Sequence, residues 1–499
     1  MFEKKIDRRH ALRLMGLTAA GAMAAACTPK AEPTAAPAAT KAPDAPAEAT
    51  KAPEVKEWTL IFDAAGATPT DMETAQEGDV IQQGLQPAAD DYKDVKPGVT
   101  IEWYRFPQGS NRTEWLNARI AAQDCPDMYW MNADALWPHV NKGWALDFTE
   151  YAKSPNPYMP GNKNWEDYID FVGRTSQIGP DGKVYGINLD GAGVLWIVNR
   201  DAYDKAGVTE LPKTWSEFMA GNEKLKESGI VPIGGDFSQQ CCFTHWTHGH
   251  VFGWLAWDNI YDFDDDGDLY VTTKEMAEYY QRGEFPLWEE FTRLAELFRE
   301  QEPYLPLGYQ GEVAYRDMFR RGEVAAYMEG NWTVTSFIKD PPPFEYTWMN
   351  YPQLTKAEWP GCPDDKKVRL QGPWGGMQYH VPGYLPETDP ERIPVIMDWL
   401  MFITQPKYVE PACAERGTVP MVEGAEAMPE IAPFTAPYDR AVPYQSWASL
   451  SAPAYESERA LLAEYAGSTM SNDELVSRGK EVWEEEVKNL LESNPDWTI

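Results

Sequence analysis

The sequence predicts an α/β protein built from two globular domains, and three observations support this prediction. Short apolar runs that suit buried strands alternate with helix-like patterns along the chain after residue 57. A leader and a Pro/Ala-rich segment take up residues 1–56, which leaves about 440 residues for folded structure. That length is more than one core usually holds, and it fits two domains on the usual scale of roughly 100 to 200 residues each.

Residues 1–27 have the organisation of a secretion signal. The pair Arg8-Arg9 precedes an apolar stretch over 12–23, and Ala24-Ala25-Ala26 comes directly before Cys27. Paired arginines before a short apolar stretch are typical of the twin-arginine export route. Small residues before a cysteine resemble a bacterial lipoprotein signal, so Cys27 is predicted to be lipidated. An ordinary signal peptide with a chance cysteine is the alternative.

Residues 28–56 are rich in Pro, Ala and Thr and cannot bury a core. Their prolines favour an extended backbone of roughly 3 Å per residue, enough to hold a domain up to about 85 Å from a membrane. The later apolar stretch 393–404 contains Pro394 and Asp398 and is shorter than the roughly 20 residues that span a bilayer. We therefore expect an extracytoplasmic protein that is attached to the cell membrane through its lipid alone.

The composition argues against some partners and favours others. With 78 acidic and 44 basic residues the net charge is −34, which repels nucleic acid and anionic lipid. The 21 tryptophans and 25 tyrosines favour a cleft in which flat rings stack on sugar faces.

The first elements follow the order strand, helix, strand. Residues 58–62 and 99–104 suit buried strands, residues 112–123 have helical spacing, and residues 126–131 return to a strand pattern. Further along, residues 184–187 and 194–198 form strand-like runs near the turn at Gly182. This alternation is typical of an α/β fold.

The middle of the chain carries the clearest helix start. Thr214-Trp-Ser-Glu217 is a capping box, and the helix that it begins is expected to stop at Gly229, before a strand over 230–233. A later strand over 324–328 ends at the turn Gly330-Asn331-Trp332. Ligands of open α/β sheets bind at such strand ends.

Five segments together resemble the extracellular solute-binding proteins of the ABC-importer sugar-binding family (family 1). They follow the family's order across nearly all of residues 58–499, although each motif alone is common. The segments are Pro126–Asp147, Gly182–Gly207, Leu211–Phe218, Arg321–Trp332 and, more weakly, Arg416–Pro420.

The resemblance implies a periplasmic-binding-protein fold, type II-like, with two α/β lobes, hinge crossovers and a ligand cleft between the lobes. The first lobe is expected to hold 58–190 and 380–412, and the second 191–379 and 413–499. Such a protein is not an enzyme and requires no cofactor. It captures a carbohydrate, here expected to be an oligosaccharide, by lobe closure and delivers it to the permease subunits of an ABC importer, acting as a monomer.

The resemblance also indicates ligand-binding residues. Trp332 is expected to stack on the sugar because it lies in a turn, with core packing as the alternative. Amides and carboxylates exchange paired hydrogen bonds with adjacent hydroxyls. The other expected ligand-binding residues are Asn132, Asp134, Asn188, Asp190, Trp374, Trp447, Asp63 and Arg416. For Asn132 and Asp134 the alternative role is helix capping, and for Trp374 it is packing at the hinge.

An acidic loop departs from the family pattern. Asp262, Asp264, Asp266 and Asp268 surround Gly267 as in the first half of a calcium loop, but the twelfth position is Thr273 and Glu275 comes two residues late. A structural Ca²⁺ is one interpretation and a solvated loop is the other.

Histidines and cysteines form a second departure. His245, His248 and His250 follow Cys241-Cys242, a donor set suited to a transition metal, but their spacing matches no established zinc motif. Polar cleft lining or packing is the alternative. Besides Cys27 there are five cysteines, and the sequence leaves the pairing of Cys125, Cys241, Cys242, Cys362 and Cys413 open, with Cys362–Cys413 a plausible bridge.

Two other functions remain. The same fold binding a peptide or an amine requires carboxylates that converge around a cation. A secreted glycan hydrolase is the enzyme alternative, but abundant carboxylates in so acidic a chain do not indicate a paired acid and base.

Overall fold

The described part of the computed structural model determines which predictions can be followed. It comprises residues 56–75, 81–107, 111–132, 139–140, 142–170, 173–174, 177–179, 181–238, 242–257, 262–263, 265, 271–284, 287–363, 366–372, 376–437, 439–442, 452–495 and 497. The leader with Cys27, the tether up to residue 55, Asp134, Trp374, Trp447 and Cys241 lie outside it, as do Asp264, Asp266 and Asp268. Within these ranges no helix has the length and apolar character to cross a bilayer.

The N-terminal strands confirm the predicted strand–helix–strand order. Strand β1 (Trp58–Phe62) pairs in parallel with β2 (Val99–Trp103), and helix α2 (Gln86–Val95) connects them. Helix α3 (Arg112–Ala121) leads to β3 (Tyr129–Trp130). A second sheet has the order β3-β10-β4, formed with β10 (Gln378–His380) and β4 (Ile187–Asn188). Segments almost 200 residues apart therefore share a sheet.

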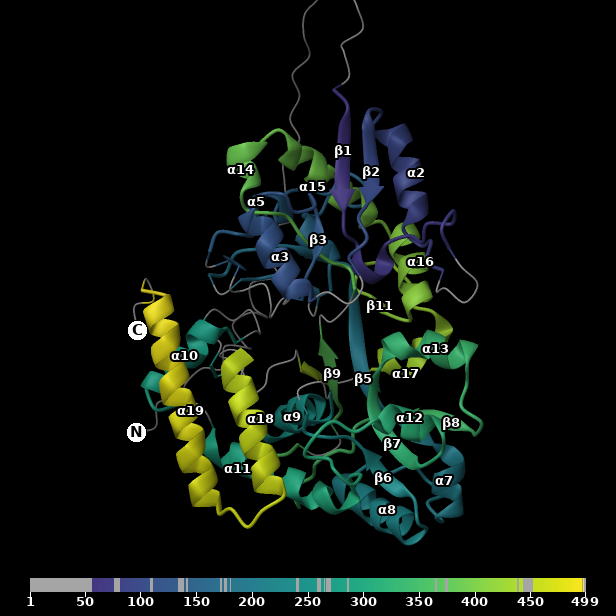
Figure 1. Ribbon diagram of the computed structural model, residues 1–499, viewed down its shortest axis with the longest axis vertical. Helices are drawn as coiled ribbons and strands as arrows, with labels where there is room; N and C mark the ends of the chain where they lie inside the picture. The colour runs from purple at the N-terminus through teal and green to yellow at the C-terminus, as the bar shows by residue number, and fades with distance from the viewer. Residues whose placement is uncertain are drawn as a thin grey trace, which may run out of the picture. The chain divides into compact units, whose positions relative to one another are not determined.

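The long strand β5 (Asp190–Asn199) organises the largest sheet (Figure 1). All ten of its residues are buried. It pairs antiparallel with four strands, which are β7 (Val324–Gly330), β8 (Tyr346–Met349), β9 (Val368–Gly372) and β11 (Val419–Pro420). Strand β6 (Val231–Gly234) runs parallel to β7, and β12 (Arg440–Val442) runs parallel to β9.

Helices and short 3-10 turns (η) connect these strands. The predicted capping box is confirmed at the start of α8, because Thr214 Oγ1 accepts from the Glu217 amide and Glu217 Oε2 accepts from the Thr214 amide. The remaining helices are α5 (Thr149–Ala152), α7 (Arg200–Lys205), α8 (Trp215–Glu227), α9 (Cys242–Leu255), α10 (Thr273–Gln281), α11 (Trp288–Gln301), α12 (Tyr315–Arg320), α13 (Val334–Lys339), α14 (Leu385–Thr388), α15 (Arg392–Ile403), α16 (Pro406–Arg416), α17 (Ala432–Thr435), α18 (Ala452–Ala466) and α19 (Asn472–Ser493). The 3-10 turns are η1 (Ala65–Ala67), η2 (Trp165–Tyr168), η3 (Glu302–Tyr304), η4 (Asn331–Thr333) and η5 (Pro429–Ile431).

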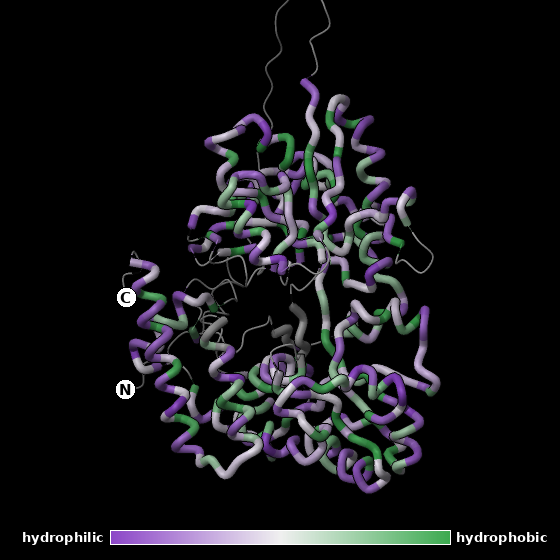
Figure 2. The backbone as a smooth tube through the Cα atoms, in the orientation of Figure 1, coloured by the Kyte–Doolittle hydropathy of each residue, from purple (hydrophilic) through white to green (hydrophobic). Residues whose placement is uncertain are grey.

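Helix α19 shows how an exposed helix is held. Hydrophilic and hydrophobic segments alternate along it in Figure 2, and its buried positions recur every four residues at Leu475, Gly479, Trp483 and Val487. This spacing gives the helix one inner face, which packs beside α18 and α11.

The described residues form two large hydrophobic cores and two smaller apolar clusters, one around Leu116 and Tyr129 and one around Leu195 and Phe434. The N-terminal core includes Leu60, Phe62, Trp399 and Val422, and the C-terminal core includes residues from Val194 to Val487. Members of the N-terminal core occur between Leu60 and Leu189 and again between Met377 and Val422. Members of the C-terminal core occur between Val194 and Val368 and again between Ala454 and Val487. Cys413 and Val422 pack in the N-terminal core. The lobe boundaries stay a prediction.

The suggested Cys362–Cys413 bridge is wrong. Cys125, Cys362 and Cys413 are all free thiols. Cys362 is buried in the C-terminal core, with its Sγ 3.8 Å from the carbonyl oxygen of Trp254, whereas Cys413 is buried in the N-terminal core. A disulfide requires Cα atoms within about 7 Å, and sequence spacing gives no information on that distance.

Candidate functional site

Half-buried aromatic side chains gather where the N-terminal strands end. Tyr104 and Phe106 follow β2, Trp130 ends β3, and Trp115 lies on α3. The Trp115 ring centroid lies 5.3 Å from that of Tyr104 and 5.4 Å from that of Phe106. Because β1 and β2 are parallel, this is the carboxyl edge of the sheet, where ligands of α/β proteins bind. We call these four residues the N-terminal aromatic cluster.

Arg112 connects this cluster to a predicted site residue. Its guanidinium carbon lies 4.2 Å from the centroid of the Phe106 ring and 5.1 Å from that of the Trp130 ring. Its Nη1 donates to Asp63 Oδ2 at 2.5 Å. Burial raises the pKa of Asp63, and the bond and charge of Arg112 oppose that rise. Asp63 is fully buried and orients Arg112, while its contact with a solute stays a prediction.

Two predicted amides lie near one another through β10. Gln378 Nε2 donates to Asn132 Oδ1 at 3.5 Å, and Gln378 is opposite Asn188 in the β10–β4 register. Asn132 is half-buried, whereas Asn188 is buried and its Oδ1 accepts from the Asp190 amide at 3.4 Å. Amides can both donate to and accept from hydroxyl groups, so this arrangement suits a polyol.

Asp190 and Arg416 are brought together where the chain passes between the cores. Asp190 accepts from the amides of Gly376 and Met377 at 3.1 and 2.8 Å, and Arg416 Nε lies 4.0 Å from its Oδ2. Burial raises the pKa of Asp190, and the charge of Arg416 opposes that rise. A Cβ at Gly376 would lie 1.6 Å from Arg416 Nη2, and one at Gly66 would lie 2.5 Å from Nη1. The guanidinium therefore occupies space that two glycines leave open.

Trp332 is positioned by the buried residue that precedes it. Asn331 accepts from the Gly193 amide at 2.9 Å and donates to the Gly417 carbonyl at 2.8 Å, which ties η4 to β5 and to the end of α16. The half-buried Trp332 ring lies over Gly330, where a Cβ would be 2.2 Å from the ring. Its centroid is 5.7 Å from that of Trp246 on α9, at an interplanar angle of 55°.

Of the three histidines of α9, two are buried and His245 is half-buried. His248 and His250 are buried, and burial lowers the pKa of His248 to about 3 and that of His245 well below its usual value. His248 Nδ1 lies 3.4 Å from Glu458 Oε1 on α18, and His250 Nδ1 lies 2.9 Å from the Trp246 carbonyl. Across the residues that the structure describes, His, Cys, Asp and Glu form no group of three suited to a metal. The burial and the contacts of His248 and His250 favour packing, the alternative to a metal site.

For the acidic loop, Glu275 already has protein partners. It forms a capping box with Thr272 at the start of α10, and its Oε1 accepts from the Asp265 amide at 2.7 Å. A calcium loop requires a carboxylate with both oxygens on the ion. The Ca²⁺ site stays a prediction, because three of its four aspartates lie outside the described residues.

The structure thus forms two groups from the predicted residues that it describes. Asp63 and Asn132 lie with the N-terminal aromatic cluster, whereas Asp190 and Arg416 lie beside the backbone that positions Trp332. Sequence reasoning missed Phe106, Arg112, Trp115, Trp130 and Trp246. Two of these residues could have been found from the sequence, because Phe106 comes shortly after a predicted strand and Trp130 lies near the end of another. Trp246 could not, because its contact with Trp332 depends on how α9 packs.

Comparison with known families identifies one match. The family model described as bacterial extracellular solute-binding protein matches residues 78–360. An uncharacterized ABC transporter extracellular-binding protein of Pyrococcus horikoshii is 25% identical over 253 residues, which is 49% of this chain. The match spans about half the length of that relative (52%).

Solved structures share the fold at low sequence identity. A family 1 extracellular solute-binding protein from Bifidobacterium longum subsp. infantis has a TM-score of 0.60 at 16% identity, covering 86% of this chain and 100% of its own. A chitin oligosaccharide binding protein has a TM-score of 0.59 at 18% identity, with 86% and 98% covered. The solute-binding protein RafE in complex with raffinose has a TM-score of 0.56 at 16% identity, with 86% and 99% covered. The predicted two-lobed α/β fold is confirmed by these likenesses.

Proposed function

Because the chain belongs to the family of bacterial extracellular solute-binding proteins, we propose that it captures an oligosaccharide and delivers it to the permease of an ABC importer. Binding requires no bond chemistry, since a ligand that contacts both lobes favours the closed state by its differential affinity. The family to which the chain belongs consists of solute-binding proteins.

One observation carries the carbohydrate assignment. At the N-terminal aromatic cluster, the half-buried rings of Phe106 and Trp130 lie beside the guanidinium group of Arg112, and the half-buried amide of Asn132 follows Trp130 by two residues in the sequence. Rings stack on the apolar faces of a pyranose while amide and guanidinium groups bind its hydroxyls. The solved structures with a similar fold include a chitin oligosaccharide binding protein and RafE in complex with raffinose, which supports a sugar as the ligand.

The described carboxylates do not favour a glycan hydrolase. Asp63 and Asp190, the two carboxylates among the described sugar-binding candidates, are both fully buried and are held by an arginine or by backbone amides. A glycosidase requires one carboxylic acid and one carboxylate that reach the sugar from opposite sides. Within the described residues, binding is the function that the geometry supports.

Attachment and assembly follow from the leader and the family. We propose that Cys27 carries a lipid, that residues 28–56 act as the tether, and that the protein works as a monomer outside the cytoplasm. Radiolabelled fatty acid should be incorporated into the full chain but not into its Cys27→Ala variant, and label in both would contradict the lipid site.

The solute is tested by thermal shift and calorimetry on the full-length protein with chitotriose, maltotriose, xylotriose and raffinose, beside a peptide and an amine. We expect a saturable rise in melting temperature with one saccharide class. Trp332→Ala should weaken that binding at least about fivefold, because a stacking contact is worth roughly 1 kcal/mol or more.

Trp348→Ala is the matched control, since Trp348 is also half-buried but packs on Phe434 with ring centroids 4.7 Å apart. It should change stability and leave saccharide affinity unchanged. Rises with the peptide or the amine alone, or cleavage of a saccharide, would contradict the proposal.

A further inference from the structure

A groove outside the two site groups lies between α11, α19 and the segment 355–362. Its volume is about 390 Å³, which falls in the range of small-ligand sites. It is lined by Trp288, Glu289, Thr292, Arg293, Glu296, Trp359 and Val476. We propose that this groove, which we call the outer groove, binds one sugar ring of a carbohydrate as a second site.

The first wall of the outer groove is a tryptophan that lies over a glycine. Trp288 is half-buried at the start of α11, and a Cβ at Gly479 would lie 2.8 Å from its Cζ3 atom. Gly479 is inside the 22-residue helix α19, where glycine costs about 1 kcal/mol relative to alanine. The helix thus has a glycine where the ring requires space, and the Trp288 ring packs directly against the backbone of α19.

The second wall is fixed by hydrogen bonds. The amide and hydroxyl of Thr355 both donate to Glu358 Oε2 at 2.7 Å, and Arg293 Nε donates to the Glu358 carbonyl at 3.0 Å. These bonds hold the segment that carries the half-buried Trp359, whose Nε1 would lie 3.1 Å from a Cβ at Gly361. A ring whose orientation is already fixed loses little entropy when it binds a ligand.

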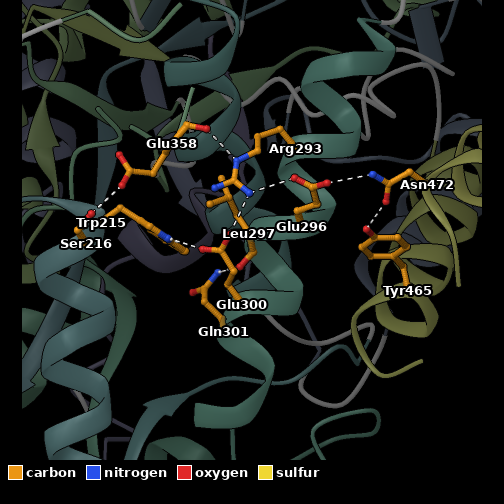
Figure 3. Close-up of polar contacts among 10 residues, drawn as sticks. All are labelled: Trp215, Ser216, Arg293, Glu296, Leu297, Glu300, Gln301, Glu358, Tyr465 and Asn472. Carbon is orange, nitrogen blue, oxygen red and sulfur yellow. Dashed lines mark hydrogen bonds and ion pairs between the residues drawn. The ribbon is translucent and has the colours of Figure 1, made fainter. Parts of the chain in front are cut away.

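Two of the lining residues, Arg293 and Glu296, belong to a connected polar network, whose bonds Figure 3 shows. Arg293 Nη1 donates to Glu296 Oε2 at 3.1 Å and to Glu300 Oε1 at 2.9 Å. Glu296 Oε1 accepts from Asn472 Nδ2 at 3.0 Å, which joins α11 to α19. The guanidinium charge is balanced within the protein, so the outer groove does not require a charged ligand.

The lining selects among ligand classes. The carboxylates of Glu289 and Glu296 outnumber the one paired guanidinium of Arg293, so the lining repels a phosphate or an acidic sugar. A neutral ligand with flat apolar faces and a rim of hydroxyl groups fits two tryptophans and several hydrogen-bonding side chains. A pyranose ring has this chemistry. The proposal does not depend on lobe closure, because the outer groove shares no residue with the candidate site.

The test is fluorine NMR of the full-length protein labelled with 5-fluorotryptophan, titrated with chitotriose, maltotriose, xylotriose and raffinose. Trp288→Phe, Trp359→Phe and Trp348→Phe assign three resonances. We expect the Trp288 and Trp359 resonances to shift together and saturably with at least one saccharide, while the Trp348 resonance does not move. Trp288→Ala should weaken this binding about tenfold at the Trp359 resonance.

The Trp332→Ala variant separates this proposal from the proposed function. The two shifts should persist in that variant even though binding at Trp332 is lost. Shifts that disappear with Trp332→Ala would overturn the second site, because they would report lobe closure. No shift of either resonance with any of the four saccharides in the folded protein would overturn it as well. Shifts at the outer groove without any effect at Trp332 would support it and contradict the candidate site instead.

Discussion

At the scale of single residues, glycines decide where the charged and aromatic side chains of the site lie. Gly66 and Gly376 make room for Arg416, and Gly330 makes room for Trp332. In each case the missing Cβ is the structural requirement. The role of each glycine depends on a contact with a residue far away in the sequence. The run Gly372-Pro-Trp-Gly-Gly376 by itself indicates only that another group can approach the backbone closely, and the structure identifies that group as the Arg416 guanidinium.

We expect Gly376→Ala to destabilise the protein by about 1 to 3 kcal/mol, because the new Cβ overlaps the Arg416 guanidinium and moves it from the buried Asp190. Urea denaturation of both proteins measures this loss. The control is Gly311→Ala, where the nearest atom to the new Cβ is the Gly308 carbonyl oxygen at 3.9 Å. That variant should stay within about 0.5 kcal/mol of the parent. Equal midpoints for all three proteins would show that Arg416 moves at no cost.

At the scale of elements, local signals identified starts and ends better than partners. The capping box at Thr214 and the strands beginning at Trp58 and Val99 were predictable, because caps and apolar runs act within a few residues. The pairing of β3 with β10, far along the chain, was not, since strand pairing depends on tertiary packing. Trp246 was missed for the same reason, because its contact with Trp332 depends on the packing of α9.

Helix α19 allows a double-mutant cycle with α11. In the parent, Gly479→Ala should destabilise by about 1 kcal/mol despite its better helix propensity, because the new Cβ lies 2.8 Å from the Trp288 ring. In the Trp288→Ala background the same change should stabilise by up to about 1 kcal/mol. The resulting coupling energy, measured by denaturation, should exceed about 1 kcal/mol. Additive effects would mean that Trp288 does not need the glycine.

At the scale of the whole molecule, burial of histidines makes stability depend on pH. His139 is buried, with its Nε2 2.6 Å from Asn117 Oδ1. Burial, together with the charges of Lys142 and His380, lowers its pKa to about 4. Between pH 6.5 and 4 the unfolded chain therefore binds a proton at this residue that the folded protein does not. Stability from this residue is complete above pH 6.5 and is lost as the pH falls.

We expect the parent to lose on the order of 1 kcal/mol more than His139→Gln between pH 7 and pH 5, measured by urea denaturation at each pH. Other groups, such as Glu458, whose pKa is raised by burial, titrate in both proteins and cancel in the comparison. Parallel pH profiles would show that His139 is protonated equally in the folded and unfolded states.

The interleaving of the two cores has a consequence for synthesis. The N-terminal core begins at Leu60 but includes Val422, and the C-terminal core runs from Val194 to Val487. A ribosome that makes the chain from its N-terminus has therefore released neither complete set of core residues until most of the polypeptide has emerged. Apolar residues of the N-terminal core therefore stay exposed on the nascent chain while the ribosome translates residues of the C-terminal core. Chaperones are needed most during this stage of synthesis.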